Sequence, residues 1–99
     1  MIARMWHGMT PAEKADEYLA FLQQRALPDY RGTPGNIAAC ILRRIEGEVA
    51  HFTTLTYWDS LESIKAFAGS DISMARYYPE DAGFLIEFEP TVSHSELYS

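Results

Sequence analysis

Few side chains in this sequence of 99 residues could do chemistry, and they form no complete catalytic or metal-binding set. His7, His51 and His94 lack the spacing of paired helical ligands or of a zinc motif. Cys40 stands within the apolar run AACIL, which favours a small core residue over a reactive thiolate. Phosphate loops, dinucleotide-binding glycines and an elbow serine are also missing. We therefore expect neither a metal nor a cofactor.

Aromatic side chains are the more informative group. Rings gather in the predicted strands and around the predicted second helix, where they could line a pocket for a flat apolar ligand. Trp58 and Tyr77 stand out because each lies at the end of a predicted element rather than in its middle. The alternative is that the rings form only the core and a dimer interface. The candidate rings are Trp6, Tyr57, Trp58, Phe67, Tyr77, Tyr78 and Phe84.

Two ionisable residues of the first predicted strand could serve such a pocket. His7 ends the strand, and an imidazole can act as a base near neutral pH. Arg4 lies among apolar residues, where an isolated cation is costly to bury. We expect Arg4 to reach the sheet edge, to pair with Glu87 or Glu89, or to meet an anionic ligand. Strand alternation points Arg4 and His7 to opposite faces, so at most one should face a common pocket.

The elements that position these residues begin with a strand over 2–8 and a helix over about 11–25. Thr10, Pro11 and Glu13 have the types and spacing of a helix start. Residues 27–36 contain two prolines and two glycines, which predicts a long loop. Two strands follow, over about 37–45 and 49–58, and Gly47 supplies their tight turn.

The second half is predicted to begin with a helix capped by Asp59 or Ser60, with an apolar stripe from Leu61 to Ala68 and a stop at Gly69. Ser70 could cap a further short helical piece before Pro79. In residues 84–90, FLIEFEP, Phe84, Ile86 and Phe88 alternate with other residues, which predicts a half-buried strand. The segment TVSHSELY could add one more short strand.

This order predicts an α+β fold of the ferredoxin-like type, βαββαβ, in one domain over 1–99. Both helices should cover one face of an antiparallel sheet. The other face also carries apolar and aromatic residues, and a second copy of the chain would cover it economically. We therefore expect a homodimer.

Charge and hydropathy narrow the range of partners. The net charge is −6 and the sequence pI is near 4.9, with only eight lysines and arginines, which argues against nucleic acid. No apolar run approaches the length of a membrane span. One cysteine and no leader-like N-terminus predict a cytoplasmic protein. The partners we expect are a second copy and a small aromatic or apolar ligand.

The stretch LTYWDSLESIKAFAGSD resembles the antibiotic biosynthesis monooxygenase superfamily of dimeric α/β-barrel proteins. A strand ending in tryptophan, a polar turn and a helix with an apolar stripe carry the resemblance, which extends over nearly all of residues 1–97. It implies that Trp58 is a pocket residue. Tyr77 falls where the haem-degrading branch has a histidine, and Arg4, Trp6 or His7 stands where that branch has an asparagine. These departures make haem degradation the less favoured reading.

The resemblance implies a cofactor-independent monooxygenase that oxidises a small phenol, anthrone or quinol with dioxygen. His7 would then be the base, Arg4 the partner of the anion, and Trp58 with Tyr77 the walls or hydrogen-bond donors. Trp6, Phe67 and Tyr78 would complete the substrate pocket. The alternatives are a non-catalytic dimeric barrel that binds a small molecule and, third, a haem-binding or haem-degrading protein.

Overall fold

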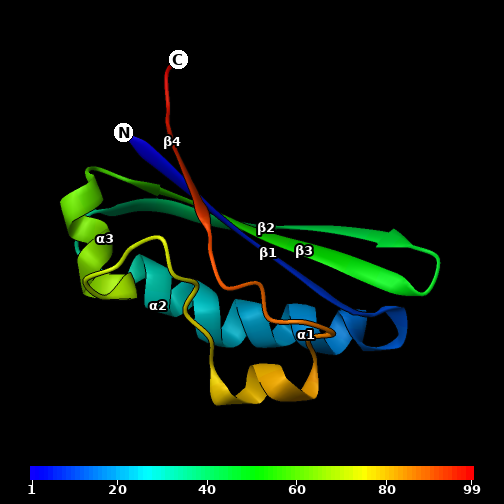
Figure 1. Ribbon diagram of the computed structural model, residues 1–99. Coiled ribbons are helices and arrows are strands. Elements are labelled where there is room, and N and C mark those ends of the chain that lie inside the picture. The colour runs from blue at the N-terminus through cyan, green and yellow to red at the C-terminus, as the bar shows by residue number, and fades with distance from the viewer.

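The computed structural model describes residues 1–99 and has the predicted ferredoxin-like α+β architecture (Figure 1). Four antiparallel strands form one sheet in the order β2-β3-β1-β4. The strands are β1 (Ile2–Pro11), β2 (Asn36–Glu46), β3 (Val49–Trp58) and β4 (Ser93–Glu96). The helical segments are η1 (Ala12–Lys14), α1 (Ala15–Phe21), η2 (Leu22–Ala26), α2 (Leu27–Arg31), α3 (Leu61–Ala68) and η3 (Pro79–Gly83).

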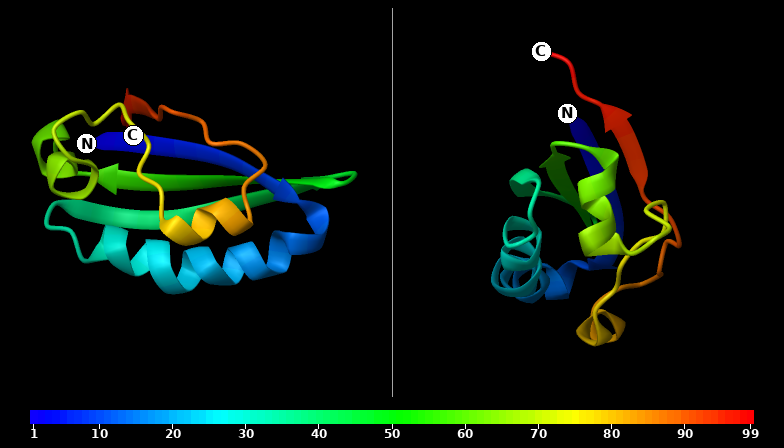
Figure 2. Two further views of the ribbon diagram at one scale, coloured as in Figure 1. Left: turned by 60° about the horizontal axis from the view of Figure 1, so that its bottom comes forward. Right: turned by 90° about the vertical axis from the view of Figure 1, so that its left-hand side faces the viewer.

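All helical segments lie on one side of the sheet, as predicted, and the other side is bare (Figures 1 and 2). Alternation along β1 and β3 sets the two faces: Arg4, Trp6, Phe52 and Thr54 are buried beneath the helices. On the bare face Leu42 is 51% exposed. No helix of the structure has the length and apolar character needed to cross a bilayer.

The β2–β3 hairpin and α3 confirm the sequence interpretation. Gly47 turns the hairpin at φ 60°, a backbone conformation that glycine adopts without strain. Ser60 is the N-cap of α3, and its hydroxyl accepts a hydrogen bond from the Ser63 amide at 3.3 Å. Gly69 ends the helix at φ 90°.

The first helix differs from its prediction at both ends. Strand β1 continues to Pro11, and the Thr10 hydroxyl donates to the Pro11 carbonyl instead of capping a helix. The helix then continues through α1, η2 and α2 to Arg31, so residues 27–31 are not loop. Pro28 does not stop it because η2 is a π-helical turn, in which the Leu27 amide donates to the Leu22 carbonyl five residues back.

The region after α3 also differs. Residues 70–78 contain no helix, and η3 begins at Pro79, where we expected a helix to end. Residues 84–90 form no strand, and their single backbone hydrogen bond to β1 joins the Ile86 amide to the Met9 carbonyl. Contacts with residues 73–77 hold the chain away from β1: the Ala75 amide donates to the Pro90 carbonyl at 3.0 Å, and the Tyr77 hydroxyl to that of Glu89 at 2.5 Å. The fourth strand is therefore Ser93–Glu96.

Cys40 is a further correction, because its side chain is exposed on the bare face rather than buried in the core. Its neighbour Ala39 is the buried residue, and alternation along β2 turns Cys40 the other way. An apolar run on a strand whose two faces are not both covered therefore does not imply burial.

Candidate functional site

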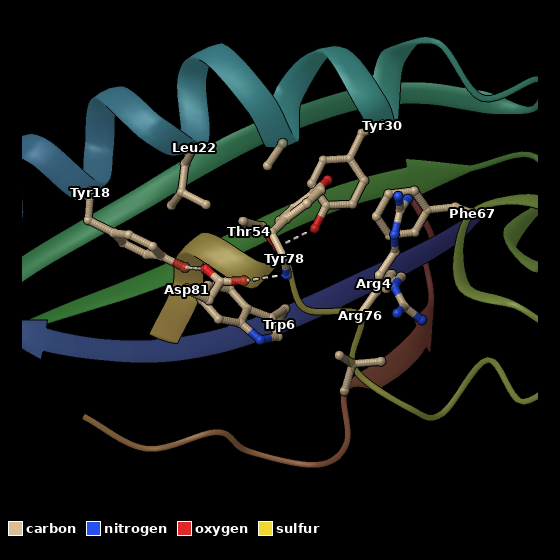
Figure 3. Close-up of a pocket in the computed structure, with 12 residues that line it drawn as sticks. Arg4, Trp6, Tyr18, Leu22, Tyr30, Thr54, Phe67, Arg76, Tyr78 and Asp81 are labelled. Carbon is tan, nitrogen blue, oxygen red and sulfur yellow. Dashed lines mark hydrogen bonds between the residues drawn. The ribbon is translucent and has the colours of Figure 1, made fainter. Parts of the chain in front are cut away.

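A small cavity lies between the sheet and the long helix, which runs from Ala15 to Arg31 through α1, η2 and α2 (Figure 3). The closing segment, residues 70–83 after α3, covers the cavity. The volume of the cavity is about 20 Å³, room for roughly one water molecule. Eight of its twelve lining residues are hydrophobic. The lining residues are Arg4, Trp6, Tyr18, Leu22, Ala26, Tyr30, Thr54, Phe67, Arg76, Tyr78, Asp81 and Val92.

The long helix supplies one wall through four buried residues spaced by four: Tyr18, Leu22, Ala26 and Tyr30. In a regular α-helix residues at this spacing drift round the axis by about 40° per step, because 3.6 residues make a turn. The π-helical turn of η2 offsets that drift. Both tyrosines therefore reach the same cavity from the two halves of the helix.

The central strands supply the floor. Arg4 and Trp6 from β1 and Thr54 from β3 share the helix-facing side of the sheet. Thr54 pairs with Trp6 in the β1–β3 register, and its hydroxyl is 3.1 Å from that of Tyr30. Burial raises the pKa of Tyr30, so its phenol stays protonated.

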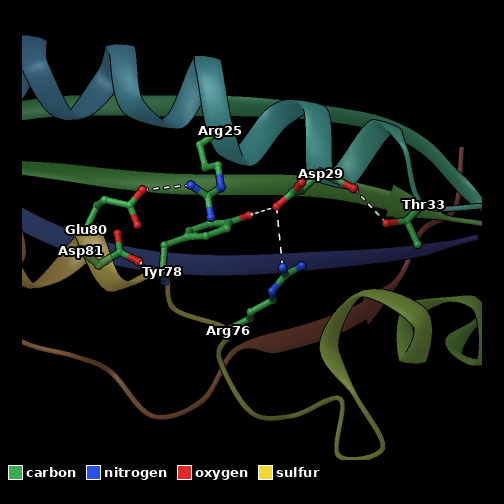
Figure 4. A network of polar contacts seen from close by, with 7 residues as sticks. All are labelled: Arg25, Asp29, Thr33, Arg76, Tyr78, Glu80 and Asp81. Carbon is green, nitrogen blue, oxygen red and sulfur yellow. Dashed lines mark hydrogen bonds and ion pairs between the residues drawn. The ribbon is translucent and has the colours of Figure 1, made fainter.

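The closing wall comes from Arg76, Tyr78 and Asp81, which polar contacts hold against the long helix (Figure 4). The Tyr78 hydroxyl donates to Asp29 Oδ2 at 2.6 Å, and an Arg76 guanidinium nitrogen lies 3.7 Å from the same oxygen. At the outer rim Arg25 pairs with Glu80 at 2.9 Å. Apart from η3 and a bridge between Met74 and Thr91 the segment has no regular structure, and these side-chain contacts help to hold it in place.

Asp81 is a buried acidic residue, only 3% exposed. Its Oδ1 accepts the Tyr18 hydroxyl at 2.7 Å, and its Oδ2 accepts the Tyr78 amide at 2.7 Å. Burial raises the pKa of Tyr18, and the hydrogen bond to Asp81 raises it further. A carboxylate offers about four acceptor positions, so Asp81 retains the capacity to accept a proton or hydrogen bond from a ligand.

Arg4 is the most deeply buried cation, with 3% exposure. Its Nη1 donates to the Ile72 carbonyl at 2.5 Å and lies 3.0 Å from His94 Nε2, and its Nη2 donates to the Met74 carbonyl at 3.3 Å. None of the chain's ion pairs includes Arg4. The expected pairing of Arg4 with Glu87 or Glu89 is absent, and its side chain lines the cavity instead.

Four of the seven site residues predicted from the sequence line this cavity: Arg4, Trp6, Phe67 and Tyr78. Trp58 does not. It is fully buried behind the lining, with its Nε1 donating to Thr56 Oγ1 at 2.8 Å and its ring 6.2 Å from that of Phe67. Trp58 therefore supports the wall without reaching the cavity.

Tyr77 and His7 also lie outside the cavity. The Tyr77 ring stands 6.2 Å from Trp6, and its hydroxyl accepts from Trp6 Nε1 at 3.3 Å. His7 is on the bare face, with Nδ1 2.5 Å from Glu89 Oε2 and Nε2 3.0 Å from His51 Nδ1. The sheet separates His7 from Arg4, as strand alternation requires.

The residues that sequence reasoning missed come mainly from the long helix and from the closing segment. The spacing of four in Tyr18, Leu22, Ala26 and Tyr30 was a usable signal, but reading residues 27–36 as a loop removed Tyr30 from it. Arg76 and Asp81 carry no local signal, because only the tertiary path of the segment brings them to the cavity.

No protein-family model matches the chain, and no curated protein matches it in sequence. Solved structures do match in fold. MhuD of Mycobacterium tuberculosis, a haem degrader with two haems bound in its active site, aligns with a TM-score of 0.65 and 20% identity over 98% of this chain and 95% of MhuD. This chain has the same fold.

Two further structures agree. A MhuD mutant with two manganese protoporphyrin IX molecules bound per active site aligns with a TM-score of 0.61 and 18% identity, covering 98% of this chain and 94% of the mutant. A candidate antibiotic biosynthesis monooxygenase from Bacillus cereus aligns at 0.58 and 15% identity, covering 96% and 87%. The three alignments therefore agree on the fold of this chain.

The residues around the cavity do not fit haem. No lining residue is a histidine, cysteine or methionine. Tyr18, Tyr30 and Tyr78 all have raised pKa values because of burial, which opposes the tyrosinate needed to hold ferric iron. The pKa of Tyr77 is raised as well, mainly by burial. Elsewhere, no group of three or more His, Cys, Asp or Glu is arranged to hold a metal ion.

Proposed function

We propose that this chain is a small-molecule oxygenase that oxidises a phenol-type aromatic substrate with dioxygen in the cavity between sheet and long helix. The observation that carries the proposal is the lining itself: aromatic walls enclose a buried carboxylate, Asp81, and a buried guanidinium, Arg4. A flat ring suits such walls, and the two charges suit the formation of an anion from a neutral phenol.

Asp81 is the proposed proton acceptor, with the Tyr18 hydroxyl orienting its carboxylate. The positive charge of Arg4 favours the electron-rich anion that forms, because electrostatic interactions are stronger away from bulk water. His7, the base favoured by sequence reasoning, lies on the other face of the sheet, beside Glu89 and His51. A His7 variant is therefore compared with an Asp81 variant in the test below.

The proposed reaction needs no additional reductant. The phenol loses its hydroxyl proton to Asp81, and the anion gives one electron to dioxygen. The resulting radicals couple at a ring carbon, forming a carbon–oxygen bond. Breaking the oxygen–oxygen bond then leaves a quinone, and the second oxygen atom departs as water with the two hydrogens from the substrate.

A ring can enter only if a wall moves, because the closed cavity has room for roughly one water. The closing segment around Tyr78 is the proposed moving part. It has little regular structure, and polar contacts such as Tyr78–Asp29 fasten it at its rim. Closing it again over a bound ring would exclude water from the reacting anion.

Oxygen uptake tests this proposal, measured with a panel of phenols, anthrones and naphthols on protein treated with a chelator. The expected result is turnover by the wild type and a fall of about 100-fold or more in Asp81→Asn, since general bases contribute roughly 10²–10⁴. Lys65→Gln, which breaks only an exposed ion pair with Glu62 on α3, away from the cavity, is the matched control. A loss of turnover in His7→Gln but not in Asp81→Asn would reject the assignment of the base.

A second candidate is a binding protein that does not turn its ligand over. Every buried side-chain polar atom has a hydrogen-bond partner, which favours this candidate. A pocket that only binds a ligand would have the same property. Ligand binding with no oxygen uptake across the panel would select this candidate. A haemin titration showing a saturable Soret change would instead revive the haem alternative.

We also propose that the chain is a homodimer formed through the bare face of the sheet. Exposed apolar side chains, among them Met5 and Leu42, lie on that face, and a second copy could cover them symmetrically. The cavity lies on the opposite side of the sheet, so both copies would keep a complete site. Sedimentation equilibrium of the purified chain tests this part.

A further inference from the structure

The cavity is charged in opposite senses at its two ends (Figure 3). Tyr18 and Asp81 lie at one end, Arg4, Phe67 and Arg76 lie at the other, and Trp6 lies between them. A ligand that spans the cavity would therefore meet a hydrogen-bond acceptor at one end and cations at the other.

The cationic end has more positive charge than its surroundings offset. Arg4 is bonded only to neutral partners, namely the backbone carbonyls of Ile72 and Met74 and the ring of His94. Burial lowers the pKa of His94, and the charge of Arg4 lowers it further, so His94 does not supply a second charge near neutral pH. A buried guanidinium with no anionic partner is unusual, because buried charges are normally paired.

Arg76 adds a second guanidinium at the same end. Its central carbon lies 4.7 Å from the centre of the Phe67 ring, and that of Arg4 lies 5.9 Å from the same centre. Its one carboxylate partner, Asp29, is 3.7 Å away and already accepts the Tyr78 hydroxyl at 2.6 Å. Arg76 is therefore positioned to exchange this long contact for a shorter one to a ligand anion.

We infer that the ligand is an aromatic hydroxy acid: a ring with a phenolic hydroxyl directed at Asp81 and a carboxylate, at the other end, directed at Arg4 and Arg76. The inference rests on the proposal that this cavity is the substrate site, and it adds the class of substrate. The carboxylate supplies the counter-charge that Arg4 lacks, and the aromatic walls contact both faces of the ring.

The test is a set of anaerobic binding titrations followed by tryptophan fluorescence, since Trp6 lines the cavity. The three probes are para-hydroxybenzoate, para-cresol, which lacks the carboxylate, and benzoate, which lacks the hydroxyl. We expect para-hydroxybenzoate to bind at least about tenfold more tightly than either of the others, because each of the others lacks one hydrogen bond to a charged group. Excluding oxygen separates binding from turnover.

The decisive variant is Arg76→Gln, because the Arg76 side chain is half-exposed and its replacement should not prevent folding. Arg4 is less suitable, because replacing it would break buried hydrogen bonds that support the fold. Arg76→Gln should weaken the binding of para-hydroxybenzoate by about tenfold and leave the affinity for para-cresol unchanged. Lys65→Gln removes the same charge from α3, outside the cavity, and should change neither.

Several results would overturn the inference: equal affinities for para-hydroxybenzoate and para-cresol, equal weakening of both in Arg76→Gln, or no binding of any probe. Its failure is distinct from that of the proposed oxygenase. Carboxylate-dependent binding without oxygen uptake would retain the ligand class and reject the oxygenase. Oxygen uptake with neutral phenols alone would do the reverse.

Discussion

The Tyr78 hydroxyl donates to Asp29 Oδ2 at 2.6 Å, joining the segment that closes the cavity to the end of the long helix. Tyr78 follows α3 by ten residues, and Asp29 belongs to α2, so the contact links parts of the chain that are far apart in sequence. Because Asp29 also faces Arg76, one carboxylate fastens two of the residues that line the closing wall.

Asp29→Ala should loosen this wall without unfolding the protein. The lost hydrogen bond and ion pair are partly exposed, so we expect global stability to fall by only about 1–2 kcal/mol. Local opening of the closing segment should become more frequent. Hydrogen exchange followed by mass spectrometry should therefore show faster exchange in residues 70–85. The β2–β3 hairpin, residues 36–58, is the internal control, and faster exchange there as well would indicate general destabilisation instead.

The two tryptophans should separate stability from binding. Trp58 is fully buried and its Nε1 donates to Thr56, so Trp58→Phe should cost about 1–2 kcal/mol of unfolding free energy in urea. Trp6 lines the cavity, so Trp6→Phe should weaken ring binding more than Trp58→Phe does. If Trp58→Phe abolished ligand binding at unchanged stability, Trp58 would belong to the ligand site itself.

His94 should make the fold sensitive to mild acid. Burial and Arg4 hold the folded-state pKa of His94 below the unfolded value of about 6.5. As the pH falls below that value the unfolded chain binds a proton before the folded chain does, so stability decreases until the folded-state pKa is passed. Urea unfolding should therefore show His94→Gln losing less stability than the wild type between about pH 7.5 and pH 5.

Glutamine at this position keeps an acceptor for Arg4 Nη1 and removes the titration. His7 and His51 remain in both proteins, so the difference between the two pH profiles isolates His94. Parallel profiles would show that burial and Arg4 do not lower the pKa of His94.

Leu42→Glu should prevent dimer formation if the bare face is the interface. Leu42 is 51% exposed on β2, and a carboxylate there could not be covered by a second copy without a desolvation cost. Leu61→Glu is the matched control, because Leu61 is 48% exposed but lies on α3, on the other side of the sheet. Sedimentation equilibrium should give a monomer for Leu42→Glu and a dimer for Leu61→Glu. If both variants were dimers, the interface would lie elsewhere.

Local signals predicted the part of the fold that local chemistry determines. The turn at Gly47, the cap at Ser60 and the stop at Gly69 each act within a few residues, and all three are confirmed. The long helix was cut short because Pro28 normally ends a helix, whereas a π-helical turn accommodates it here. The alternating segment at 84–90 was misassigned because only Ile86 makes a backbone hydrogen bond to β1, whereas Glu89 and Pro90 bond to Tyr77 and Ala75.

The candidate site divides in the same way. Arg4 and Trp6 were predictable because strand alternation assigns them to one face, and Phe67 belongs to the stripe of α3. The position of Trp58 behind Phe67 depends on packing that no sequence period describes. Arg76 and Asp81 reach the cavity only because residues 70–83 run back alongside the long helix, which no local pattern specifies.

The most direct test of the central claim is a crystal structure of the chain grown anaerobically with para-hydroxybenzoate. The account predicts the ring between the sheet and the long helix, its carboxylate on Arg4 and Arg76, its hydroxyl on Asp81, and the segment around Tyr78 moved outward. A ligand bound beside His7 on the bare face, with the cavity still closed, would contradict it.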